Sequence, residues 1–237
     1  MNHLELPRTT NVPHPATALL HRGRPAAQRV VRRAWAVEVH GADRVPPSGP
    51  VVFAGNHIGF LDGPVLAICA PRPVHALTKI EMFAGRLGGV LRAAGQIPVR
   101  RGEPDLGAVR TSVRVLRDGG VVGVFPEGTR GPGEVTAIEP GAAYLALVTG
   151  ATVVPVAFLG SRLPGASLSS LPPRGSRIAM TFGEPVTVAA QPWPRRRADV
   201  AATTGRIRAA MLETLRAAQT VTGMDLPGPA PEGEIEE

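Results

Sequence analysis

The sequence predicts an α/β fold in which a largely parallel, twisted sheet is flanked by helices and preceded by a basic amphipathic helical segment. Short runs rich in β-branched residues alternate with helical patterns from residue 37 onward, an order typical of parallel sheets. No stretch between residues 37 and 224 has the length and composition of a linker. Because a chain of 237 residues with 43% apolar composition can bury one large core, we expect one domain over residues 37–224.

The first 36 residues form a basic segment. The stretch from Arg8 to Arg33 contains arginines and no acidic residue. Apolar side chains interleave with these arginines over residues 15–36, which predicts one or two amphipathic helices broken near Gly23–Pro25. Such a segment either covers the domain or lies on a membrane surface, and the sequence leaves both open. Residues 1–14 are expected to be a disordered arm.

The residue patterns of the remaining chain place strands and helices in order. The expected strands are Val37–His40, Val51–Ala54, His75–Thr78, Ile97–Arg100, Val121–Phe125, Thr152–Phe158 and Arg177–Phe182. The expected helices are Gly63–Ala70, Ile80–Ala94, Asp105–Asp118, Gly141–Thr149 and Ala198–Thr222.

The charge of the chain is unevenly distributed. The formal net charge is +7, yet residues 225–237 carry acids and no base, which predicts an acidic disordered tail. The rest of the chain is therefore more basic than the total, and a basic surface attracts nucleic acid, anionic lipid headgroups or phosphorylated metabolites. Nucleic acid is disfavoured, because the arginine clusters lack interleaved aromatic residues for base stacking.

Cysteine and histidine usage excludes several kinds of site. The single cysteine, Cys69, rules out a disulfide framework, suits a reducing compartment and lies in an apolar run, so it is expected to be a packed core thiol. The histidines lack metal-ligand spacing, so no metal is expected. The start of the chain lacks a secretory signal, and residues 141–161, the longest uncharged stretch, are interrupted by Gly150 and Pro155. We therefore expect neither export nor a membrane span.

The first candidate site follows the apolar strand Val51–Ala54, where α/β enzymes place reactive groups. His57 can take a proton from a hydroxyl near neutral pH, and a carboxylate on its other nitrogen fixes the tautomer and stabilises the imidazolium. Asp62, five residues on across a strand-to-helix turn, can fold back onto His57. Alternatively, Asp62 caps the helix that begins at Gly63-Pro64.

Two further strand ends carry charged groups. The run Phe125–Arg130 ends a β-branched strand and brings a carboxylate, a hydroxyl and a guanidinium into one loop, where Arg130 could bind a phosphate. A solvated turn with a Glu127–Arg130 ion pair is the alternative. Arg100 and Arg101 end another strand, and because side chains alternate, one of the two faces the site.

Together these motifs resemble the lysophospholipid acyltransferase family, which includes the 1-acyl-glycerol-3-phosphate acyltransferases. His57 with Asp62 is similar to the family's histidine–four residues–aspartate motif, and Phe125–Arg130 to its Phe-Pro-Glu-Gly-Thr-Arg motif. Residues Gly95–Arg101 resemble the intervening block that ends in arginine, and Val153–Ala157 the later strand that contains proline. The four motifs occur in the family's order over residues 37 to about 188, which makes 37–224 the expected acyltransferase domain.

The resemblance implies transfer of an acyl group from acyl-CoA or acyl-ACP to a lipid hydroxyl, with no cofactor beyond this thioester co-substrate. By matching position, His57 would be the general base and Asp62 its orienting partner. The residues implied to line the acceptor's phosphate pocket are Lys79, Arg101, Glu127, Gly128, Thr129 and Arg130.

The implied acceptor is lysophosphatidic acid, which would give phosphatidic acid. A lyso-aminolipid or a glycolipid stays open as the acceptor, because Arg100 stands where many members carry an acid and Gly131 where many carry a serine. Since acceptor and product would be lipids and no span is found, we expect the protein to lie on the cytoplasmic membrane face. Residues 1–36 are the candidate docking segment on an anionic membrane surface.

Overall fold

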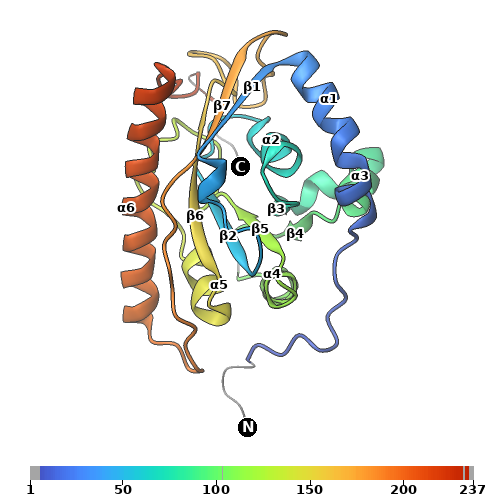
Figure 1. Ribbon diagram of the computed structural model, residues 1–237, viewed down its shortest axis with the longest axis vertical. Coiled ribbons are helices and arrows are strands. Elements are labelled where there is room, and N and C mark those ends of the chain that lie inside the picture. Colours follow the sequence, from blue (N-terminus) through green and yellow to red (C-terminus); the bar gives the residue numbers. More distant parts are fainter. Residues whose placement is uncertain (1–5, 103, 232, 235–237) are drawn as a thin grey trace.

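The computed structural model describes residues 6–102, 104–231 and 233–234, and it contains one seven-stranded sheet flanked by helices (Figure 1). The strand order is β1-β7-β6-β2-β5-β3-β4, and all neighbouring pairs are parallel except β6 with β7. The predicted α/β fold with a largely parallel sheet is confirmed. The strands are β1 (Ala36–His40), β2 (Val51–Gly55), β3 (His75–Lys79), β4 (Ile97–Val99), β5 (Val121–Val124), β6 (Thr152–Leu159) and β7 (Arg177–Phe182).

The helices cover both faces of the sheet. They are α1 (Arg24–Ala34), α2 (Asp62–Cys69), α3 (Gly85–Ala93), α4 (Leu106–Arg117), α5 (Gly141–Thr149) and α6 (Arg197–Thr222), with a π-helical turn at Leu19–Gly23 and 3-10 turns at Ala42–Arg44 and Ile80–Phe83. One core lies between the sheet and α4, α5 and α6, and a second lies between the sheet and α2 with the inner side of α1. Within the described residues, no helix combines the length and apolar character needed to cross a bilayer.

The centre of the sheet determines where the site can lie. Every residue of β2 is buried, as expected for a central parallel strand covered on both faces. β2 pairs in parallel with β5 and β6, and β3 lies between β5 and β4. The carboxyl ends of β2, β3, β4, β5 and β6 therefore meet at one edge of the sheet, where open α/β sheets hold their ligands.

The helix predicted over Ile80–Ala94 is wrong as a single element, because the chain breaks at Ala84. A 3-10 turn at Ile80–Phe83 precedes the break, and α3 begins at Gly85 with a positive φ of 59°. Gly88 packs so closely on the carbonyl of Phe83 that a Cβ there would overlap it. The break thus depends on glycines that a periodicity argument counts as tolerated helix positions.

The basic N-terminal segment packs against the domain. In α1, Nε of Arg24 and Nε2 of Gln28 donate to the carbonyl of Ile68 at 2.9 and 2.7 Å, while Val31 and Trp35 pack on the second core. Ahead of α1, the arm predicted to be disordered runs along α4, where arginine side chains donate to its carbonyls. Residues 1–5 of that arm lie outside the described residues.

The described part of the acidic tail also contacts the domain, which differs from the expected disorder. Leu226 packs on two core clusters, and the carbonyl of Gly228 accepts a 2.6 Å hydrogen bond from Nη2 of Arg162. Oε2 of Glu234 accepts from the backbone N–H of Leu168 at 2.9 Å. Residues 232 and 235–237 lie outside the described part of the chain.

Candidate active site

His57 and Asp62 lie in direct contact at the carboxyl end of β2. His57 follows the strand, Asp62 is the first residue of α2, and Nδ1 of His57 lies 2.8 Å from Oδ2 of Asp62. The same oxygen accepts backbone N–H groups from Ile58 at 2.7 Å and Gly59 at 2.9 Å. The side chain of Asp62 is fully buried and turns back on the preceding loop, away from the helix amides that an N-cap would serve. The geometry is that of a histidine oriented by a carboxylate.

His57 is held through its ring and through its backbone. Its ring stacks on Phe125 with the centroids 4.3 Å apart and an interplanar angle of 24°. Its backbone N–H donates to Oε1 of Glu127 at 2.8 Å, and its carbonyl accepts from the N–H of Gly131 at 2.9 Å. The side chain remains 19% exposed, so the ring is fixed and still accessible to a substrate.

Glu127 connects the Phe125–Arg130 loop to the loop that carries His57. Its second oxygen accepts the backbone N–H of Val135 at 3.3 Å, so both carboxylate oxygens serve amides. Burial raises the pKa of Glu127, and the two amide hydrogen bonds oppose that rise. The loop is thus no freely solvated turn, and Glu127, expected in the acceptor's pocket, holds the backbone of the candidate base in place.

Three basic residues lie at the same edge of the sheet. Lys79 ends β3, Arg101 follows β4, and Arg130 follows β5. Nη1 of Arg101 donates to the carbonyl of Gly128 at 2.7 Å, while Arg100 is exposed; both arginines lie beyond the end of β4 at Val99. Nη1 of Arg130 donates to the carbonyl of Leu168 at 2.8 Å. The expected pocket residue Thr129 is exposed in the same loop.

Sequence reasoning missed Ser161 and Arg162, which follow β6 after Gly160 at this edge. Oγ of Ser161 donates a short hydrogen bond to Oδ1 of Asp62. Arg162 is 1% exposed and donates from Nε to the carbonyl of Ile58 at 2.7 Å. One sequence feature could have identified them: a Ser-Arg pair follows an apolar strand. The other strands that end at this edge of the sheet are also followed by polar residues.

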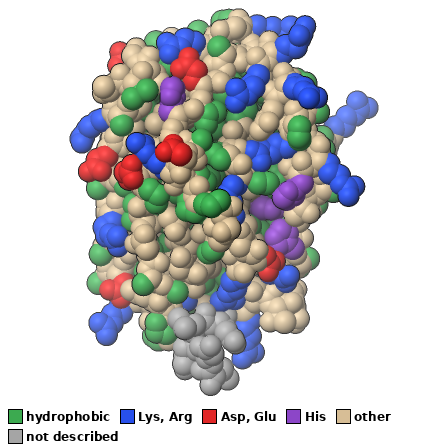
Figure 2. Space-filling view, viewed as in Figure 1, with side chains coloured by type: hydrophobic (Ala, Val, Ile, Leu, Met, Phe, Trp, Pro, Cys, Tyr) green, Lys and Arg blue, Asp and Glu red, His purple; other side chains and the backbone are tan. Residues whose placement is uncertain are grey.

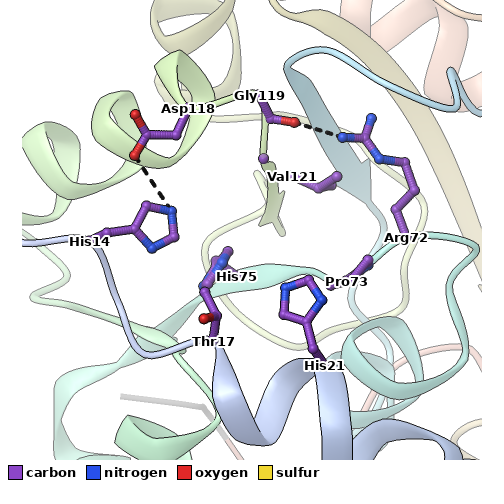
Figure 3. Close-up of a pocket in the computed structure, with 10 residues that line it drawn as sticks. His14, Thr17, His21, Arg72, Pro73, His75, Asp118, Gly119 and Val121 are labelled. Carbon is purple, nitrogen blue, oxygen red and sulfur yellow. Dashed lines mark hydrogen bonds and ion pairs between the residues drawn. The ribbon is translucent and has the colours of Figure 1, made fainter.

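A separate cavity of about 290 Å³, lined by three histidines among other residues, lies at the opposite edge of the sheet, where β3 and β5 begin (Figure 3). His14, His21 and His75 point into it, and Asp118 lies 3.9 Å from Nε2 of His14. Arg72 lines its rim and donates to the carbonyl of Gly119. Among the described residues, no group of three or more His, Cys, Asp and Glu is arranged to hold a metal ion.

Cys69 lies in α2 and is buried in the second core, as its apolar run predicts. Burial raises the pKa of its thiol, and the nearby charges of Arg32 and Arg24 oppose that rise.

Comparisons with known proteins agree with these motifs. The 1-acyl-sn-glycerol-3-phosphate acyltransferase of Bacillus subtilis is 31% identical over 126 residues, which are 52% of this chain and 63% of that protein. The human enzyme named 1-acyl-sn-glycerol-3-phosphate acyltransferase alpha is 34% identical over 51% of this chain and 44% of its own. The matches thus span 44 to 63% of the length of these relatives.

The fold has a solved counterpart. The crystal structure of the 1-acyl-sn-glycerophosphate acyltransferase PlsC from Thermotoga maritima superposes with a TM-score of 0.60 at 20% identity, over 84% of this chain and 81% of that one. That likeness concerns the fold. The family model described as Acyltransferase matches residues 36–159, more than half of the chain, and its span contains His57, Asp62 and the Phe125–Arg130 loop. On that match the chain belongs to the acyltransferase family.

Proposed function

We propose that this protein transfers a fatty acyl group from acyl-CoA or acyl-ACP to the free hydroxyl of lysophosphatidic acid, which forms phosphatidic acid. The observation that carries the proposal is the contact of His57 with a fully buried Asp62 at the sheet edge that also bears Lys79, Arg101 and Arg130. The relatives named 1-acyl-sn-glycerol-3-phosphate acyltransferase support the choice of acceptor.

The chemistry needs a base and a donor that is already activated. Asp62 holds Nδ1 of His57, so Nε2 takes the proton of the acceptor hydroxyl as its oxygen attacks the thioester carbonyl. A tetrahedral oxyanion forms, the C–S bond breaks, and the thiolate leaves with the proton that His57 carries. No covalent acyl-enzyme is required, and no cofactor acts beyond the thioester co-substrate.

The acceptor's phosphate carries up to two negative charges, so a pocket for it needs more than one cation. Lys79, Arg101 and Arg130 supply three, from three adjacent strand ends. A guanidinium presents a planar fork that binds phosphate through two hydrogen bonds. A lyso-aminolipid or glycolipid would instead favour one cation with several neutral hydrogen-bonding groups, and this remains the second candidate because of Arg100 and Gly131.

The same proposal places the protein on an anionic membrane surface, through α1. The inner side of α1 packs on the domain, while Arg22, Arg29, Arg32 and Arg33 are exposed, and Val30 is 68% exposed. Figure 2 shows Lys and Arg side chains gathered over the edge where α1 lies in Figure 1. The two functions that the sequence left open are compatible, because opposite sides of one helix carry them.

The decisive experiment is a competition assay. Purified protein is given labelled acyl-CoA or acyl-ACP and an equimolar mixture of lysophosphatidic acid, phosphate-free lysolipids and lyso-aminolipids, because specificity is a ratio of kcat/KM values. We expect phosphatidic acid as the main product. Preferential acylation of a phosphate-free lysolipid would replace lysophosphatidic acid as the acceptor, and no transfer to any hydroxyl would overturn the proposed activity.

A further inference from the structure

We infer that Ser161 and Arg162 are positioning residues for the acyl-transfer reaction: Ser161 sets the strength with which Asp62 orients His57, and Arg162 fixes the loop that carries both. This inference rests on the proposed function, since it assigns roles to side chains around its base. Both residues lie just beyond residues 36–159, the span that the family model covers.

Ser161 completes the hydrogen bonding of the buried carboxylate. Oδ2 of Asp62 is shared by three donors, namely Nδ1 of His57 and the N–H groups of Ile58 and Gly59. Oδ1 takes its donor from Oγ of Ser161, which itself has 0% exposure. A buried anion attracts a proton less strongly when more donors share its charge. The hydrogen bond from Ser161 therefore weakens the attraction of Asp62 for the Nδ1 proton of His57.

Arg162 ties together four backbone segments around the site. Nε donates to the carbonyl of Ile58 at 2.7 Å, and Nη1 donates to Ala166 at 3.1 Å. Nη2 donates to Gly131 at 3.1 Å and to Gly228 at 2.6 Å. One side chain thus joins the His57 loop, the loop after β5, the loop after β6 and the C-terminal segment.

These bonds give Arg162 a place in the reaction geometry. Ile58 directly follows His57, and the N–H of Gly131 donates to the carbonyl of His57. The guanidinium therefore holds the residue that follows the base and the residue that hydrogen-bonds to the carbonyl of the base. A lysine lacks the fork of donors needed to reach all four carbonyls, although it keeps the charge.

The loop after β2 also lies in close contact with Ser161 and Arg162. A Cβ on Gly59 would lie 2.8 Å from the carbonyl oxygen of Ser161 and 3.2 Å from Cβ of Arg162. The loop after β2 therefore packs directly on the Ser161–Arg162 backbone. A shift of a few tenths of an ångström here moves the donors to Asp62, and geometry at a reacting group is costly to lose.

The first test uses two substitutions at Ser161. Ser161→Ala removes the hydroxyl, and Ser161→Cys keeps nearly the same volume while offering only a weak donor. We expect both to lower kcat about 10- to 100-fold with the acceptor KM within twofold, because an Asp62 carboxylate without its Oδ1 donor no longer holds His57 in one orientation. We also expect the acidic limb of the pH–rate profile to move to higher pH, because Asp62 then holds the proton on His57 more strongly.

A readout without substrate separates this inference from the proposed function. The Nδ1–H proton of His57, shared with Asp62, is followed by NMR in histidine-labelled protein and assigned by its loss in His57→Asn. We expect its resonance to move downfield in both Ser161 variants. If the resonance moves while wild-type protein transfers no acyl group, the positioning role stands and the proposed activity fails.

The opposite pattern overturns the inference. If the wild-type protein is active and both Ser161 variants leave the resonance and the pH limb unchanged, Ser161 has a packing role only. Ser161→Cys resembling the wild type while Ser161→Ala does not would also reduce Ser161 to a packing role, since volume would then be what matters. Arg162→Lys should lower kcat at least tenfold in a protein that still folds, and normal turnover by that variant would remove Arg162 from the assignment.

Discussion

The backbone N–H of His57 donates a 2.8 Å hydrogen bond to Oε1 of Glu127, so the second motif loop supports the base from behind. Asp62 orients the imidazole and Glu127 orients the backbone that carries it. The first contact is local, between residues five positions apart, whereas the second joins residues 70 positions apart. The acid of the Glu-Gly-Thr-Arg loop thereby has a structural partner, while the arginines around it remain candidates for the phosphate.

Replacing Glu127 should therefore affect turnover more than acceptor binding. Glu127→Gln keeps the size of the side chain but offers one oxygen where two amides need acceptors. Losing one hydrogen bond to a charged acceptor costs about 1.5 to 3 kcal/mol, so we expect kcat to fall at least tenfold while the acceptor KM changes little. Steady-state kinetics with varied acceptor measures this, and a large rise in KM alone would return Glu127 to the phosphate pocket.

Removing the base is the most direct test of the mechanism. His57→Ala should lower kcat by a factor of about 10² to 10⁴, the usual cost of losing a general base, because the acceptor hydroxyl then loses its proton only to water. Thermal unfolding checks that the fold survives, as the ring is partly exposed and β2 is unaffected. Near-normal transfer by a folded His57→Ala protein would contradict the assignment.

Removing one of the basic side chains should weaken binding of the acceptor lipid and leave binding of the thioester donor unchanged. Arg130→Ala deletes a guanidinium that could bind phosphate through two hydrogen bonds, so we expect acceptor binding to weaken by about 1.5 to 3 kcal/mol with the thioester KM almost unchanged. Arg100→Ala is the matched control, because Arg100 is exposed and lies beside the half-buried Arg101. A variant in which only donor affinity fell would show that the pocket is misplaced.

The sequence predicts this site well where its signals are local and poorly where they are distant. A buried run such as β2 and a turn that places Asp62 five residues after His57 can both be inferred from neighbouring residues. Ser161 and Arg162 reach Asp62 and Ile58 across about a hundred residues, and their pairing exists only after β6 docks beside β2. The break at Ala84 was missed for a related reason, since Gly88 is required by a contact with Phe83 and not by helical periodicity.

The proposed membrane docking through the exposed arginines of α1 predicts a salt-dependent interaction with anionic vesicles. Each arginine near such a surface adds about 1 kcal/mol, screened by salt. We expect Arg29→Glu combined with Arg33→Glu to reduce co-sedimentation with phosphatidylserine-containing liposomes about 100-fold or more, because both side chains are exposed on α1. Arg24→Gln is an unsuitable comparison, since Arg24 contacts the domain; Arg216→Glu on α6 is the matched control. If liposome binding changed neither with salt concentration nor with the double substitution, docking by α1 would be ruled out.

The histidine cavity predicts how the stability of the protein depends on pH. His75 is 4% exposed, and Nδ1 donates to the carbonyl of Gly95 at 2.6 Å. Burial lowers the pKa of His75 from its ordinary value of 6.5; the carbonyl hydrogen bond opposes this, and the nearby charges of His14 and His21 reinforce it. Asp118 and Arg72 are the other charged groups that line the cavity.

A histidine whose pKa is lowered by folding is more readily protonated in the unfolded chain. Its contribution to stability is present above pH 6.5 and is lost as the pH falls below that value toward the folded pKa, by at most about 1.4 kcal/mol per pH unit. His75→Asn keeps a donor near the position of Nδ1 and removes the titration, so the variant should lose less free energy of unfolding than the wild type between pH 7.5 and 5.5. Urea unfolding at both pH values measures the difference. Equal losses in wild type and His75→Asn would show that the acid sensitivity arises elsewhere in the fold.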